Sequence, residues 1–177
     1  MILGLMFFLF SQAAAPAPDA GVPAEPGVYL HQVDTGWVRL SPAEISGADA
    51  RGVRLFVYTG GYTDTGMRLT CPGPAAAVRL SARKPTLYLR EAGTVEDALI
   101  VRLRKKKDSR VLTTSFSNVT VGNKRGFDRK DVFRLRRLEH ADGAYSVSPE
   151  KDLPPGEYLL VFGDALPAYD FGIDRAR

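Results

Sequence analysis

Short runs of β-branched, aromatic and aliphatic residues, interrupted every few positions by Gly, Pro, Asn or Asp, recur along most of the chain. Runs of this kind are typical of β-strands, and the interruptions are typical of turns. Residues 28–33 and 37–40 flank Asp34-Thr35-Gly36, in which the Gly can take a positive φ, so they predict a hairpin that Trp37 anchors. Further strands are predicted at residues 53–58, 67–70 and 75–81, with a loop at 59–66.

The pattern becomes more regular after Pro85. Strands are predicted at residues 86–90, 98–104, 110–116, 132–138, 144–148, 157–162 and 169–173. Apolar and polar positions alternate within 98–104 and 132–138, so one face of each strand can meet water. Seven strands over about ninety residues is the count of an immunoglobulin-like sandwich, and no segment keeps a helical period long enough for a helix.

These patterns predict an all-β protein. We expect an immunoglobulin-like antiparallel β-sandwich at residues 85–174, preceded by a smaller β-module at 27–84. The sequence leaves open whether the two modules share one core.

The clearest local signal is the corner Asp-Leu-Pro-Pro-Gly-Glu-Tyr at residues 152–158. Prolines and glycine are poorly suited to a helix or a central strand, and an apolar run follows them. A Tyr directly after such a corner resembles the tyrosine corner of Greek-key β-sandwiches, in which the hydroxyl bonds a backbone group of the turn. The resemblance implies structural roles for Pro155, Gly156 and Tyr158.

The amino-terminal residues predict export. Residues 1–10 are apolar but too short to cross a bilayer as a helix, and the small residues that follow suit cleavage, so residues 1–15 are interpreted as a signal peptide. Residues 16–26 are rich in Ala, Pro and Gly and predict a poorly ordered leader. We therefore expect a periplasmic or extracellular protein with no transmembrane span after cleavage. The single cysteine, Cys71, excludes an intramolecular disulfide and is expected to pack as a small hydrophobe.

Basic residues supply the main candidate for binding. The formal net charge is +4, which favours polyanionic surfaces without requiring them. Two basic stretches, on a predicted hairpin tip and in a long loop, would form a cationic patch if they lie at one end of the sandwich. The candidate residues are Arg104, Lys105, Lys106, Lys107, Arg110, Lys124, Arg125, Arg129 and Lys130. Charged tips also keep exposed hairpins soluble, which needs no ligand. Nucleic acid is not an expected partner, because the run lacks interleaved aromatic residues.

Signals for catalysis are sparse. Asp-Thr-Gly occurs at residues 34–36 and 64–66, and aspartic proteases use two such triplets because paired carboxylates can act as acid and base on one water. Here Trp37 and Met67 follow the triplets, and both triplets lie where turns are expected. The two histidines, His31 and His140, match no ligand spacing, so no metal, no cofactor and no enzymatic activity are predicted.

The carboxy-terminal half resembles the small secreted β-sandwich domains of bacteria, including immunoglobulin-like and prealbumin-like modules similar to carboxypeptidase regulatory domains. The resemblance covers about residues 85–174 and is carried by the sequence around Asp142-Gly143-Ala144-Tyr145, by the corner at 152–158, and by Tyr169-Asp170-Phe171-Gly172. It implies a non-catalytic accessory or binding domain outside the cytoplasm. The leading hypothesis is an exported envelope protein that binds a protein partner or an anionic envelope polymer. An aspartic-type peptidase and a self-associating structural component are the alternatives.

Overall fold

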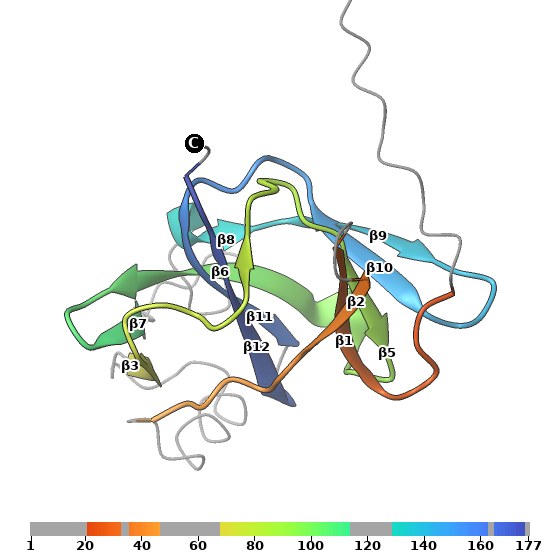
Figure 1. The fold of residues 1–177 in the computed structure, drawn as a ribbon, viewed down its shortest axis with the longest axis horizontal. Helices are drawn as coiled ribbons and strands as arrows, with labels where there is room; N and C mark the ends of the chain where they lie inside the picture. Colours follow the sequence, from red (N-terminus) through yellow and green to blue (C-terminus); the bar gives the residue numbers. More distant parts are fainter. Residues whose placement is uncertain (1–20, 33–35, 47–67, 114–128, 163–164, 176–177) are drawn as a thin grey trace, which may run out of the picture.

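A computed structural model describes residues 21–32, 36–46, 68–113, 129–162 and 165–175 of the chain (Figure 1). These residues form two β-sheets and two short 3₁₀-helices, η1 (Val95–Asp97) and η2 (Arg129–Asp131). The all-β prediction is confirmed.

One sheet has five strands in the order β2-β1-β5-β10-β9, and every neighbouring pair is antiparallel. Its strands are β1 (Gly27–Gln32), β2 (Gly36–Leu40), β5 (Leu87–Arg90), β9 (Leu135–Glu139) and β10 (Tyr145–Pro149). The predicted hairpin forms β1 and β2, and Gly36 takes the positive φ, +71°, that the turn composition anticipated.

The second sheet has seven strands in the order β3-β7-β6-β11-β12-β4, with β8 paired to β6 off this path. Its strands are β3 (Arg68–Pro72), β4 (Arg79–Leu80), β6 (Ala98–Lys105), β7 (Ser109–Thr113), β8 (Val132–Phe133), β11 (Gly156–Phe162) and β12 (Ala165–Ile173). The short strand β4 runs parallel to β12, so this sheet is mixed and the expectation of a purely antiparallel fold is wrong there. β4 and β12 are far apart in the sequence, so no tight hairpin imposes an antiparallel direction on this pair.

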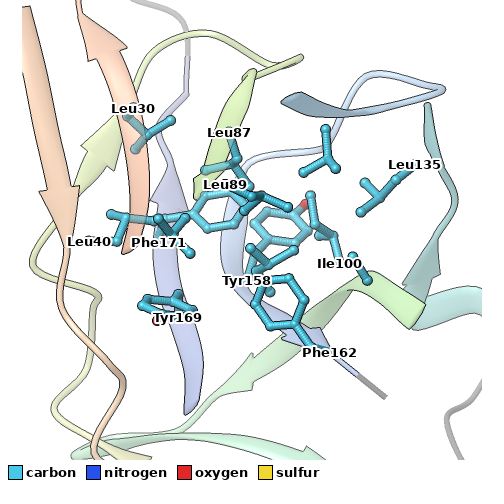
Figure 2. Packing of buried hydrophobic residues seen from close by; sticks show 14 of the residues in the cluster. Leu30, Leu40, Leu87, Leu89, Ile100, Leu135, Tyr158, Phe162, Tyr169 and Phe171 are labelled. Carbon is cyan, nitrogen blue, oxygen red and sulfur yellow. The ribbon is translucent and has the colours of Figure 1, made fainter. Parts of the chain in front are cut away.

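The two sheets pack face to face, as in a β-sandwich, around one apolar cluster. Val28, Leu30 and Leu40 from the predicted small module lie in the same cluster as Leu89 and Phe171 from the predicted sandwich. Figure 2 shows Tyr158 and Phe171 side by side at its centre, and their rings stack with centroids 5.7 Å apart. The strands β1, β2 and β4 of the predicted small module therefore share one core with strands of the predicted sandwich.

A second apolar cluster covers the opposite face of the seven-stranded sheet. Val101 and Leu103 of β6 pack there with Leu159 of β11, beneath Ala43 and Ile45. The segment that carries Ala43 is tied to β12, because the Ala43 N–H donates to the Ala168 carbonyl oxygen at 2.7 Å. Both faces of β6 are thus covered near its middle, although the alternation predicted one face in water.

The run predicted as a single strand at residues 132–138 divides between the two sheets. Val132 and Phe133 pair with β6 in the seven-stranded sheet, whereas residues from Leu135 onward pair with β10 in the five-stranded sheet. Arg134 lies at the change of sheet and is exposed. A continuous apolar and polar alternation cannot reveal such a switch, because both halves keep the period of two.

The corner at residues 152–158 has the geometry expected from the sequence. The Tyr158 hydroxyl donates a hydrogen bond to the Pro154 carbonyl oxygen, and Tyr158 is fully buried at the start of β11. Leu153 is fully buried as well, and its N–H donates to the Arg83 carbonyl oxygen at 2.7 Å. The corner therefore joins the loop before β5 to the central strand of the core.

Residues 22–26 of the predicted leader are held against the five-stranded sheet. The Arg90 guanidinium donates to the carbonyl oxygens of Val22 and Pro23, and the Tyr29 hydroxyl donates to the Glu25 carbonyl oxygen at 2.9 Å. The expectation of a poorly ordered tether is wrong for this stretch, because these side chains bond its backbone. Residues 1–20, which include the predicted signal peptide, lie outside the described residues.

Candidate functional site

An exposed basic cluster lies on the turn between β6 and β7. The Lys106 N–H donates to the Ser109 carbonyl oxygen at 2.8 Å, and Lys105 pairs with Arg110, so Lys107 and Asp108 form a two-residue hairpin loop. A further bond, from the Gly73 N–H to the Asp108 carbonyl oxygen at 3.1 Å, ties the loop to the end of β3. These hydrogen bonds fix the backbone of the turn, from which the long lysine side chains extend.

Four consecutive cationic side chains on this turn are exposed: Arg104, Lys105, Lys106 and Lys107. We call these four residues the basic turn. It projects from one end of the molecule, at the left of Figure 1. The Arg104 guanidinium lies 3.4 Å from the Asp131 carboxylate, which brings η2 and its exposed Lys130 to the same region. The structure therefore brings together part of the predicted patch.

The remaining residues of the predicted patch are Arg110, Lys124, Arg125 and Arg129. Arg129 belongs to η2, and nothing is described of its side chain; Lys124 and Arg125 lie outside the described residues. Arg110 was placed in the patch wrongly, because it is only 4% exposed. Its guanidinium donates to the Asp170 carboxylate and to the carbonyl oxygens of Pro72 and Gly73. It lies on the covered face of the sheet, so it is not part of the exposed basic surface of the turn.

Arg110 belongs instead to an ion network that is buried at Arg110 and Glu157 and partly exposed at Arg79 and Asp174. Glu157, 5% exposed, accepts a hydrogen bond from the Arg79 guanidinium at 2.5 Å and one from the Ala76 N–H at 2.8 Å, and it lies 4.0 Å from Arg110. Arg79 also pairs with Asp174 at 2.6 Å. Pairing and hydrogen bonds offset the large cost of removing these charges from water. The network connects β4, β7, β11 and β12.

Gly172 makes room for this network. A Cβ atom built on Gly172 would lie 1.8 Å from the nearest Arg79 guanidinium nitrogen, so only glycine leaves that position free for the arginine. The hydrogen bond from Arg79 to Asp174 is the main cause of a raised pKa for the guanidinium. The sequence offered one hint of the network, namely a lone Glu in the otherwise apolar run after the corner.

A cavity of about 320 Å³ opens beside the network. Its walls include Pro42, Ala43 and Pro72, and its charged residues are Arg39, Glu44, Arg110 and Asp170. The two cations and two anions balance, and Arg110 already has its partners, so the cavity selects no particular ligand charge.

Cys71 lies next to Arg110 on the covered face and is completely buried. Burial raises the pKa of its thiol, and the nearby Arg110 only partly opposes this. A thiol that is both buried and harder to ionise is a poor nucleophile. Its packing as a small hydrophobe is as expected from the sequence.

The outer face of the five-stranded sheet carries an aromatic cluster. The Trp37 ring contacts His31 and Tyr88 edge to face, with centroids 5.0 and 4.9 Å apart, and the Tyr88 ring lies 5.8 Å from His140. The two histidines, far apart in the sequence, thus lie in one cluster, which no local pattern could have predicted. Among the described residues, no group of three or more His, Cys, Asp or Glu side chains is placed to hold a metal ion.

The two Asp-Thr-Gly triplets cannot be placed together. Only Gly36 belongs to the part of the chain that the structure describes, and Asp34 and Asp64 lie outside it. No structural observation therefore supports a pair of catalytic carboxylates.

No family model matches the chain, and neither a curated protein nor a solved structure matches it. Within the described ranges, no helix is long and apolar enough to cross a membrane.

Proposed function

We propose that the protein is an exported, non-catalytic β-sandwich module of the cell envelope, of the immunoglobulin-like or prealbumin-like kind, that binds an anionic polymer through the basic turn. The observation that carries this proposal is the row of four exposed cationic side chains on a hairpin tip with a fixed backbone. The apolar stretch at residues 1–10 supports export.

The chemistry of the basic turn favours a polymer over a small ligand. Lysine ammonium groups on flexible stems act as point charges and lack the planar, bidentate geometry with which arginine selects a single phosphate or carboxylate. Adjacent lysines instead gain from displacing the counterions that surround a chain of negative charges. Binding of this kind tolerates many polymer sequences and weakens steeply with salt.

The test is retention of the mature chain, begun at Asp19, on immobilised heparin across a salt gradient. We expect the Lys105→Glu, Lys106→Glu, Lys107→Glu variant to elute at much lower salt than the wild type. The matched control is Lys84→Glu, Lys151→Glu, Arg175→Glu, which makes the same change in net charge at exposed positions outside the hairpin of β6 and β7. The control should elute closer to the wild type.

Two outcomes would contradict the proposal. Equal losses in both triple variants would show that retention reports net charge and not the basic turn. Elution of the wild type at low salt would direct the search to a protein partner.

A further inference from the structure

We propose that the free edge of β9 is a self-association site, at which a second copy of the chain adds its own β9 antiparallel, with the two-fold axis at Leu138. β9 is the last strand of the five-stranded sheet, and in the described part of the chain it pairs only with β10. This inference does not depend on polymer binding by the basic turn.

Backbone hydrogen bonds show which groups of β9 face outward. The His140 N–H donates to the Ala144 carbonyl oxygen at 2.8 Å, and the Arg134 carbonyl oxygen accepts from the Glu150 N–H at 3.0 Å. Both bonds face β10, and the register between them is unbroken, so the even-numbered residues of β9 point their backbone groups toward β10. The N–H and C=O groups of the odd-numbered residues therefore point to the free edge.

Arg137 and Glu139 provide the outward backbone groups that a partner strand needs. The carbonyl oxygen of Leu135, the remaining odd-numbered residue, already accepts a bond from the Arg137 guanidinium at 3.4 Å. A two-fold axis at Leu138 sets Arg137 opposite Glu139 of the second copy. Residues that exchange both N–H···O bonds in this way form the closely bonded pairs of an antiparallel ladder.

Charge favours this register over the registers in which the two-fold axis lies at another residue of β9. An axis at Arg136, Arg137 or Glu139 would set that residue opposite itself, and like charges directly opposite each other destabilise a sheet. With the axis at Leu138, each Arg137 faces a Glu139 of opposite charge. The Arg137 guanidinium remains bonded to the carbonyl oxygens of Val95 and Ala98, so its contribution is its charge.

Leu138 supplies the apolar contact at the axis. It is 61% exposed and is the one large hydrophobic side chain so exposed in the described residues. In the proposed pairing it occupies a non-hydrogen-bonded position, where opposite side chains approach most closely. Its copy in the second chain would cover it. Figure 1 shows β9 and the basic turn toward opposite ends of the molecule, so the dimer would present two basic turns far apart.

Sedimentation velocity of the mature chain over a range of concentrations tests the proposal. We expect a reversible monomer–dimer equilibrium that Leu138→Asp weakens by about tenfold or more, because it sets two carboxylates at the axis. Glu139→Pro should act similarly, since it removes an N–H that points to the free edge and leaves the bonds to β10 intact. Ser81→Asp, at an exposed loop position, is the charge control and should dimerise like the wild type.

Circular dichroism and thermal melting of each variant must show a folded monomer. A cross-link checks the register: under an added oxidant, Leu138→Cys should give a covalent dimer, whereas Ser81→Cys should not. A wild type that stays monomeric up to its solubility limit would overturn the proposal. So would a dimer that both Leu138→Asp and Glu139→Pro retain, because its interface would lie elsewhere.

Discussion

Tyr158 shows how one side chain can join a turn to the core. Its ring stacks on Phe171 and meets Phe133 edge to face, while its hydroxyl bonds the Pro154 carbonyl oxygen in the corner. A buried carbonyl group without a partner is costly, so the hydroxyl satisfies a group that the prolines leave without a strand partner. The local sequence was sufficient to predict this role.

We expect Tyr158→Phe to lower the free energy of unfolding by about 1–2 kcal/mol, because the ring packing remains and the hydrogen bond is lost. Urea denaturation measures this loss. Tyr88→Phe is the control, since Tyr88 is half-buried and its hydroxyl makes no hydrogen bond within the described residues. Equal effects of the two substitutions would show that the corner bond contributes nothing.

The raised pKa of Tyr158 also predicts that the fold loses stability at alkaline pH. Burial raises its pKa above the usual tyrosine value, so the neutral form is favoured in the folded state. Stability should therefore be intact below about pH 10 and fall as pH rises above that value. The fall should be shallower in Tyr158→Phe than in the wild type.

At the scale of elements, the ion network holds strands that no tight turn connects. Glu157 on β11 lies between Arg79 of β4 and Arg110 of β7, and Arg110 continues to Asp170 of β12. The partners are 78 residues apart for Arg79 and Glu157, and 60 for Arg110 and Asp170. Local sequence reasoning placed Arg110 on the surface because the hairpin around it is basic.

Glu157→Ala should destabilise the fold by about 3–5 kcal/mol, because it leaves Arg110 buried with one fewer counter-charge and the Ala76 N–H without its acceptor. Glu150→Ala, at an exposed position in the loop before the corner, should change stability by less than about 0.5 kcal/mol. Chemical denaturation of both variants measures the change in the free energy of unfolding. A small loss for Glu157→Ala would mean that water replaces the missing carboxylate.

At the scale of the whole molecule, one core joins residues from both predicted modules. β1 lies between β2 and β5, and Val28 and Leu30 of β1 are buried against residues that follow Pro85. Removal of residues 1–84 would expose the edge of β5 and the apolar side chains that β1, β2 and β4 cover.

We therefore expect residues 85–177 alone to be unfolded or to aggregate. Circular dichroism and the dispersion of amide signals in an NMR spectrum would show this, with the chain from Asp19 as the folded control. A fragment with native dispersion and a cooperative melt would show instead that residues 85–177 form an independent domain.

Local sequence patterns were sufficient to predict the all-β character, most of the described strands and the corner at residues 152–158. The period of two, the turn residues and the Pro-Pro-Gly-Glu-Tyr run depend on interactions between neighbouring residues, so the strands near 28–40 and 86–104 and the Tyr158 bond were predictable. The exposed lysines of the basic turn were predictable for the same reason.

Which strands share a sheet, and which charges are buried, followed from tertiary packing that the local sequence does not show. The division of residues 132–138 between two sheets, the parallel pairing of β4 with β12, and the burial of Arg110 all depend on contacts between distant segments. Contacts between distant segments also bring His31 and His140 into one cluster with Trp37 and Tyr88. An alternating strand carries the same signal wherever it pairs, so its partner is chosen by the packing of the whole chain.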